Sequence, residues 1–139
     1  MKVDGGCHCG AIRYEAEIDP DYVLLCHCTD CQTLSGSAFR TIAVTRPGTF
    51  RLLAGMPKVY EKRADSGNVR QQTFCADCGS PVYSAPGDGS TTVVVLRVGT
   101  LRQRAELVPR DQYWFRSALG WLARLPAISR QPRQPPAPG

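Results

Sequence analysis

The chain has 139 residues, a formal net charge of +5, 42% hydrophobic residues and 21% charged residues. This length is typical of one domain, and no stretch approaches the roughly 18 to 20 apolar residues of a membrane-spanning helix. The first ten residues, MKVDGGCHCG, contain no apolar segment of the kind that secretory signals need. We therefore expect a cytoplasmic chain with no membrane span.

The positive charge is concentrated toward the C-terminus. Residues 1–100 contain ten Lys or Arg and ten Asp or Glu, whereas residues 101–139 contain seven Arg and only two acidic residues. The seven arginines are spread along this segment and do not form a compact patch with interleaved aromatic residues. The charge pattern therefore argues against nucleic-acid binding and favours a solvated surface.

Alternating apolar and charged residues predict short strands along the first hundred residues. The alternation is clearest at 12–17, where Ile12, Tyr14 and Ala16 each precede a charged residue. Turns that contain Gly or Pro separate the candidates. The further strands that we expect are 23–25, 39–44, 49–53, 58–61, 70–74, 81–84 and 91–98. Short strands joined by regular turns are typical of an antiparallel sheet, so the expected fold class is mainly β.

The C-terminal quarter of the chain is less clear. In residues 111–125, Trp114, Ala118 and Trp121 are spaced for one face of a helix, but Gly120 interrupts the pattern and the aromatic run at 113–115 favours a strand. From residue 126 the sequence is rich in proline and nearly devoid of apolar side chains. We expect a domain at 1–125 and a flexible or polyproline-like tail at 126–139.

The seven cysteines carry most of the functional information, because they all fall into three tight clusters. An odd number of cysteines at such short spacing argues against a secreted disulfide framework. In a reducing compartment, the same spacing lets short loops direct several thiolates at one ion, and zinc is the favoured metal. The clusters are Cys7 and Cys9; Cys26, Cys28 and Cys31; and Cys75 and Cys78.

Counting ligands divides the seven cysteines into four and three. Zinc binds four ligands tetrahedrally, so four thiolates complete a structural site and three leave one position open for a substrate. The C-x-x-C pair of Cys75 and Cys78 needs a second pair, and the unit at 7–9 is the remaining two-ligand motif. The unit at 26–31 then provides three ligands from one short loop. The count predicts two Zn²⁺, one structural and one catalytic.

Three segments that contain these cysteines resemble a known family. They are G-G-C-H-C-G-A-I-R-Y at 5–14, C-H-C-T-D-C-Q-T-L-S-G-S-A-F at 26–39 and F-C-A-D-C-G-S-P-V-Y at 74–83. Together they are similar to the glutathione-dependent formaldehyde-activating enzyme (GFA) family, also called the centromere-protein-V domain family, and the resemblance extends to about residue 121. The family often has a His where this chain has Gln112.

The resemblance implies a β-tent fold with zinc-binding loops and agrees with the ligand count. It implies that glutathione is a co-substrate. It also implies a structural zinc and a catalytic zinc, the former on Cys7, Cys9, Cys75 and Cys78 and the latter on Cys26, Cys28 and Cys31.

An open site with three thiolates predicts thiol chemistry. The charge of the ion lowers the pKa of a thiol that binds there. We expect the formation or cleavage of a carbon–sulfur bond in a thiol adduct of a small aldehyde, such as S-hydroxymethylglutathione. The candidate catalytic residues are Cys26, Cys28 and Cys31, and His27 between them is a weaker acid–base candidate. The alternative is a non-enzymatic zinc-binding interaction module.

Five further residues are candidates for contacting such a small-molecule thiol. Backbone N–H groups and hydroxyls after the open cluster could hold a peptide-like ligand, or form a plain turn. The residues there are Ser35, Gly36 and Ser37. Arg40 or Arg70 could bind a carboxylate of glutathione, or lie on the surface as most arginines do. The pattern predicts no oligomeric state.

Overall fold

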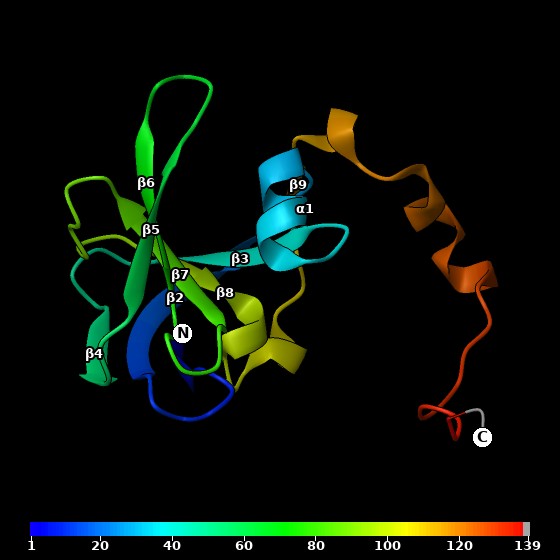
Figure 1. Ribbon diagram of the computed structural model, residues 1–139, viewed down its shortest axis with the longest axis horizontal. Coiled ribbons are helices and arrows are strands. Elements are labelled where there is room, and N and C mark those ends of the chain that lie inside the picture. Colours follow the sequence, from blue (N-terminus) through cyan, green and yellow to red (C-terminus); the bar gives the residue numbers. More distant parts are fainter. Residues whose placement is uncertain (138–139) are drawn as a thin grey trace.

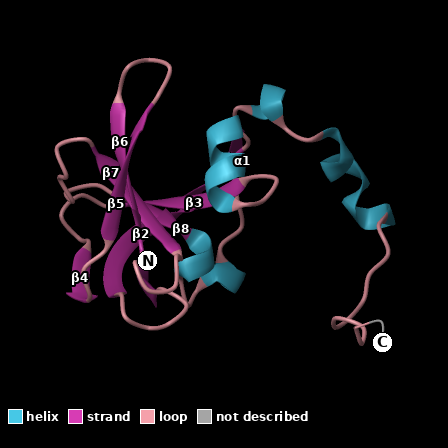
Figure 2. Cartoon of the chain, viewed as in Figure 1, coloured by secondary structure: helices cyan, strands magenta, loops and turns pink. Residues whose placement is uncertain are grey.

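The computed structural model describes residues 1–137 and confirms a mainly β fold. Within these residues, nine strands pair in one sheet, antiparallel except for a single parallel pair (Figures 1 and 2). The strands are β1 (Lys2–Gly6), β2 (Arg13–Cys26), β3 (Arg40–Thr45), β4 (Arg51–Ala54), β5 (Lys58–Arg63), β6 (Val69–Phe74), β7 (Pro81–Pro86), β8 (Val95–Arg97) and β9 (Asp111–Tyr113). None of the helices in residues 1–137 is long and apolar enough to cross a membrane.

Strand β2 organises the sheet because four other strands pair with it. The sheet runs in the order β1-β2-β3-β8-β7-β6-β5, and β4 and β9 also pair with β2. A register shift between Ile18 and Val23 divides β2. Its first half pairs with β1 and β4, and its second half with β3 and β9. The strands expected separately at 12–17 and 23–25 are thus one strand of 14 residues.

The helical elements were not expected from the sequence. Helix α1 (Thr29–Ser35) occupies a segment that we expected to be a loop, and the strand expected at 91–98 shortens to β8. Residues 111–125 form neither the long helix nor the long strand considered above, but β9 and then turns of 3-10 helix. The 3-10 helices are Val98–Thr100, Arg104–Glu106, Phe115–Ser117 and Gly120–Ala127.

The hydrophobic core covers one face of the sheet. Val23, Ala43, Leu96 and Tyr83 form successive cross-strand pairs from β2 to β7, and all four are buried in one apolar cluster. Directly paired residues share a face, and side chains alternate between faces along each strand. The positions between these core residues therefore face the opposite side of the sheet. Helix α1 lies on that side, where Lys62 of β5 forms an ion pair with Asp30 of α1.

After β9, the C-terminal segment leaves the sheet and runs away from it (Figure 1). None of residues 108–137 is buried, and the exposed side chains include Trp114, Phe115 and Trp121. A 3-10 helix crosses residue 126, where we expected the tail to start. The boundary between 125 and 126 stays a prediction, and residues 138 and 139 of the expected tail lie outside the described residues.

Candidate metal centres

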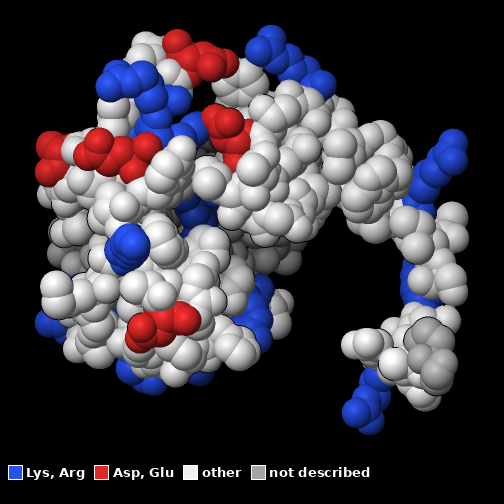
Figure 3. Space-filling model, viewed as in Figure 1, with Lys and Arg blue, Asp and Glu red and all other residues white. Residues whose placement is uncertain are grey.

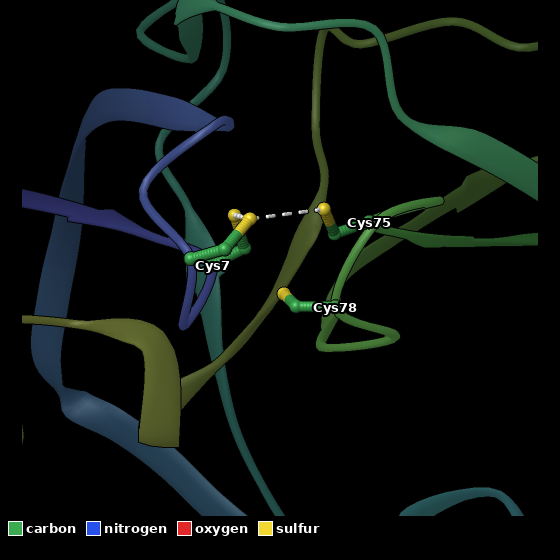
Figure 4. Close-up of side chains that lie close together, drawn as sticks. Cys7, Cys75 and Cys78 are labelled. Atoms are coloured by element: carbon green, nitrogen blue, oxygen red, sulfur yellow. Dashed lines mark hydrogen bonds between the residues drawn. The ribbon is translucent and has the colours of Figure 1, made fainter.

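The first cysteine cluster joins two turns of the sheet. Cys7 and Cys9 lie between β1 and β2, Cys75 and Cys78 lie between β6 and β7, and their four sulfurs lie within 4.8 Å of one another. The Cys7 and Cys9 sulfurs are 3.6 Å apart, and those of Cys9 and Cys75 are 3.7 Å apart. Figure 4 shows the sulfurs of Cys7, Cys75 and Cys78 turned toward one another. A tetrahedral zinc with Zn–S distances of about 2.3 Å requires S···S edges of about 3.8 Å. The four sulfurs can therefore hold a metal ion.

Local hydrogen bonds prepare two of these sulfurs, those of Cys7 and Cys78, for negative charge. The Ile12 N–H donates to Cys7 Sγ at 3.2 Å, and the Ser80 hydroxyl lies 3.2 Å from Cys78 Sγ. The contact with Ser80 lowers the pKa of Cys78 to about 5, because it stabilises the thiolate. Gly79 has φ of 77°, which a side chain would disfavour, and its N–H donates to the Cys75 carbonyl at 2.8 Å. This turn therefore holds the side chains of Cys75 and Cys78 on the same side of the chain.

The second cluster lies where β2 ends and α1 begins. Cys26 is the last residue of β2, Cys28 is the N-cap of α1 and Cys31 is in its first turn. Their three sulfurs lie within 4.8 Å of one another. Cys28 Sγ accepts a hydrogen bond from the Cys31 N–H at 3.2 Å, so it satisfies one of the free donors at the start of the helix. A strand end and a helix N-terminus thus position the sulfurs, in place of the single loop expected from the sequence.

The three sulfurs interact strongly with one another. Hydrogen bonding with Cys31 lowers the pKa of Cys26 to about 5 and raises the pKa of Cys31 well above its usual range. The cause is that one thiol stabilises the neighbouring thiolate, while a second ionisation would place two negative charges side by side. A divalent cation would remove this penalty for all three thiols, so the donor set fits a metal ion.

The predicted ligand-contact residues after α1 end the helix. Gly36 adopts the left-handed conformation at φ 64°, and the Ser37 N–H donates to the Gln32 carbonyl at 3.3 Å. This pattern is a common helix C-cap that glycine favours. The Ser35 hydroxyl also donates to the Gln32 carbonyl, at 3.5 Å. The three residues therefore fix the end of the helix that carries Cys31, and their contact with a ligand stays a prediction.

The His27 side chain is buried, although its two neighbours in the sequence belong to the second cluster. It is 1% exposed, and its ring lies 5.6 Å from each of the Phe39 and Phe115 rings in edge-on geometry. Its Nε2 is 2.8 Å from Gln112 Oε1. This environment favours a positioning role, in which His27 packs the backbone between Cys26 and Cys28.

A C-terminal strap, defined as residues 111–117, is bound to the end of β2 and to α1, the two elements that carry the second cluster. β9 pairs with the end of β2, and the His27 N–H donates to the Tyr113 carbonyl at 2.9 Å. Gln32 of α1 donates through Nε2 to the carbonyls of His27 at 2.9 Å and Ser117 at 3.0 Å. Sequence analysis did not single out Gln32, because a glutamine in a short polar segment shows no distinguishing pattern.

A cavity of about 360 Å³ lies between α1 and the sheet, beside the second cluster. Arg40, which lines it, is the cross-strand partner of Cys26, and Leu34 lies one helical turn after Cys31. Figure 3 shows Lys or Arg atoms in the hollow between the β5–β6 hairpin and α1. The lining residues are Leu34, Arg40, Tyr60, Gln72, Thr73, Phe74, Gly79, Pro81 and Arg97. Arg70 is not among them; its Nη2 donates to Ser84 Oγ at 3.1 Å.

The sequence and the fold both match known proteins. Residues 2–117 match the family described as "Glutathione-dependent formaldehyde-activating enzyme". An uncharacterized lyase of Schizosaccharomyces pombe is 28% identical over 92 residues, which cover 63% of this chain and 61% of that protein. The chain thus spans less than two thirds of this curated relative. A crystal structure of a Rhodobacter sphaeroides protein has the same fold, with a TM-score of 0.61 at 20% identity over 78% of this chain and 98% of that one.

Proposed function

We propose that this chain, which belongs to the glutathione-dependent formaldehyde-activating enzyme family, is a zinc-dependent lyase-type enzyme. The reaction would form or cleave the carbon–sulfur bond between glutathione, or another small thiol, and a small aldehyde. The relative named as a lyase supports enzymatic activity of this broad type. The seven reduced cysteines suit the cytoplasm, where thiols of both the protein and the substrate persist.

The difference between the two cysteine clusters carries the proposal. Four sulfurs complete a tetrahedral site, whereas the three sulfurs of Cys26, Cys28 and Cys31 leave one position for an external ligand. The cavity beside this second cluster provides room for the ligand. We therefore assign the structural ion to the first cluster and the catalytic ion to the second.

The reaction balances without a further co-reactant. In the direction of addition, the thiol sulfur forms a bond to the carbonyl carbon, the carbonyl π electrons move to oxygen, and the proton lost from sulfur is gained by that oxygen. In the reverse direction the carbon–sulfur bond breaks, and the aldehyde and the thiol are released. A zinc ion held by Cys26, Cys28 and Cys31 would supply positive charge, which would lower the pKa of a thiol and polarise a carbonyl oxygen.

The protein's own groups hold and orient the substrate. The cavity is lined by Leu34 of α1 and by Arg40, the cross-strand partner of Cys26, and this placement supports the approach of a thiol to the cluster from the cavity. Arg40 and Arg97 make that cavity positive, which favours the thiolate form of the substrate. Holding thiol and aldehyde at one place also removes most of the entropic cost of their encounter.

The test measures metal content and adduct exchange on the same preparation. Native mass spectrometry of the full chain should find two zinc ions per chain. NMR exchange measurements on glutathione and formaldehyde should then show faster interconversion with the adduct than in buffer alone.

Cys28→Ser provides the matched control. Serine is a good N-cap, so the substitution keeps the cap of α1 but removes one sulfur. This variant should retain one zinc ion and lose the acceleration. If the protein with two zinc ions accelerates no thiol–aldehyde exchange, the enzyme proposal is wrong and the alternative of a non-enzymatic zinc-binding interaction module is supported.

A further inference from the structure

The C-terminal arm, defined as residues 118–130, extends from the domain after the strap (Figure 1). None of its residues is buried, and each of its hydrogen bonds within residues 1–137 joins groups no more than four positions apart. The family match ends at residue 117, and the arm contains no cysteine. The arm is therefore separate from the candidate metal centres.

The 3-10 helix of the arm brings its large aliphatic side chains into one line. A 3-10 helix has three residues per turn, so residues three positions apart lie above one another. The helix Gly120–Ala127 contains Leu122 and Leu125, and its two capping residues, Leu119 and Ile128, continue the same spacing. Leu119 is 37% exposed, and Leu125 and Ile128 are each 48% exposed. These four residues form an apolar ridge that is about 18 Å long.

The arm also lies in the most basic part of the chain. Residues 112–139 contain four arginines and no lysine, aspartate or glutamate, so they provide +4 of the net charge of +5. Trp121 and Arg124 are three positions apart, which places them along the next line of the helix, beside the apolar ridge. Arg130 Nη2 donates to the Pro126 carbonyl at 3.3 Å, so this side chain folds back onto the end of the helix. On the face that Figure 3 shows, this segment has Lys or Arg atoms but no Asp or Glu atoms.

An apolar ridge beside tryptophan and arginine matches the boundary of a lipid bilayer. Aliphatic side chains enter the edge of the hydrocarbon, tryptophan prefers the level of the headgroups, and arginine binds anionic headgroups. A helix of eight residues is too short to span the bilayer, so it would lie along the surface. Charge alone favoured a solvated surface, whereas the 3-10 period adds the apolar side of the arm.

Two other partners match the arm less well. A second copy of the chain offers little complementary charge, because residues 1–111 contain 13 Lys or Arg and 12 Asp or Glu. A single-stranded nucleic acid is anionic, but its bases stack on aromatic rings, whereas the ridge is aliphatic. An anionic bilayer supplies both negative charge and an apolar phase.

We propose that the arm anchors this chain reversibly to anionic membrane surfaces. The apolar ridge enters the interface, Arg124 and Arg130 bind lipid phosphates, and the cysteine clusters stay in water. One short ridge gives a weak anchor, so the charge of the lipid and the salt concentration control the bound fraction. The inference goes beyond the proposed function and does not depend on it, because no residue of the arm is a cysteine or lines the cavity.

Co-sedimentation of the full chain with lipid vesicles tests the anchor. One set of vesicles is pure phosphatidylcholine, and in the other phosphatidylglycerol replaces half of it. The chain should bind the anionic vesicles at least tenfold more tightly, because each arginine near such a surface strengthens binding about fivefold. High salt should release it. Equal binding to the two sets, or binding to neither, would overturn the proposal.

Matched leucine variants test the ridge. Leu122→Ser/Leu125→Ser should weaken binding to the anionic vesicles about tenfold or more, because two aliphatic side chains no longer enter the bilayer. Leu52→Ser/Leu53→Ser makes the same change at two exposed positions of β4 and should bind like the original chain. Undiminished binding by the ridge variant would contradict the proposal.

Matched arginine variants test the contact with lipid phosphates. Arg124→Gln/Arg130→Gln should weaken binding about 25-fold and make it less sensitive to salt. Arg46→Gln/Arg63→Gln removes the same charge from exposed positions of the domain and should have little effect. Equal weakening by the two pairs would show that total charge, and not the arm, binds the vesicles, and would refute the anchor.

Two further results would assign the arm to another partner and overturn the membrane anchor. The first is a dimer of the full chain that Leu122→Ser/Leu125→Ser dissociates, together with no binding to vesicles. The second is single-stranded DNA that binds as tightly as the anionic vesicles and is unaffected by the leucine variant. Sedimentation velocity without lipid and a DNA titration measure these outcomes. Adduct exchange is a separate readout, so its failure would refute the enzyme and leave the anchor standing.

Discussion

The two cysteine clusters differ most in the distance that each spans along the chain, and this difference bears on the roles that we propose for them. Cys9 and Cys75 are 66 residues apart, so an ion in the first cluster would close a loop of nearly half the chain. The second cluster spans only residues 26–31. In the chain-entropy description of cross-links, closing these loops is worth about 4 and about 2 kcal/mol respectively. An ion in the first cluster would therefore contribute more to the stability of the fold than an ion in the second, which supports the roles that we propose.

The largest expected effect comes from breaking the first cluster. Cys75→Ser removes a sulfur that is 2% exposed and packs against the core, and it uncouples the two turns. Metal binding that is linked to folding should be lost with it, so we expect insoluble protein or a loss of about 4 kcal/mol in the free energy of unfolding. Chemical denaturation followed by circular dichroism measures this. A stable Cys75→Ser protein that still binds two ions would show that the first cluster is not structural.

The corresponding change in the second cluster should separate stability from activity. Cys28→Ser keeps the N-cap of α1, so the free energy of unfolding should fall by less than about 2 kcal/mol. The variant should nevertheless lose one ion and its affinity for thiols. Metal analysis and thiol titration check both expectations. If Cys28→Ser unfolds while Cys75→Ser folds and loses thiol binding, the roles of the two clusters are reversed.

A smaller effect is expected from the strap. Gln112→Leu removes the partner of His27 Nε2 and leaves that buried atom unsatisfied. The expected cost is about 1 to 3 kcal/mol in the free energy of unfolding. Gln112→Glu keeps an acceptor at this position, and Gln131→Leu makes the same exchange at an exposed site. Thermal denaturation of the three variants should place only Gln112→Leu clearly below the original protein; equal melting temperatures would mean that the strap contact is weak.

The smallest effect is expected at the C-terminus. Deletion of residues 126–139 removes no residue that is described as buried and no cysteine. The melting temperature and the zinc content of the shortened chain should therefore match those of the full chain. A fall of several degrees would show that this segment packs on the domain, and the boundary after residue 125 would then be wrong.

Local spacing was sufficient to predict the grouping of the cysteines. The C-x-C and C-x-x-C motifs are short enough for neighbouring sulfurs to converge, and ligand counting then paired 7–9 with 75–78. The strands expected at 39–44, 58–61 and 70–74 correspond to β3, β5 and β6 with small shifts at their ends.

The rest depends on pairings between distant segments. Helix α1 has no buried residue, so its sequence has no apolar periodicity that would predict a helix. Arg40 and Arg97 meet only because β3 lies between β2 and β8, an order that no local pattern encodes. A possible signal was present in Arg97, a single charge within the otherwise apolar run at 93–98. Such a charge, if buried, needs a partner of opposite sign.

The pairing of β9 with β2 sets an order of events during protein synthesis. The four-cysteine cluster is complete once residue 78 has left the ribosome, whereas the contacts from His27 to Gln112 and from Gln32 to Ser117 each join residues 85 positions apart. At typical translation rates, residues 79–117 take about 2 to 8 s to emerge after residue 78. During this interval the nascent three-cysteine segment has no strap over it. The ion that we propose for the second cluster could therefore bind before the strap closes.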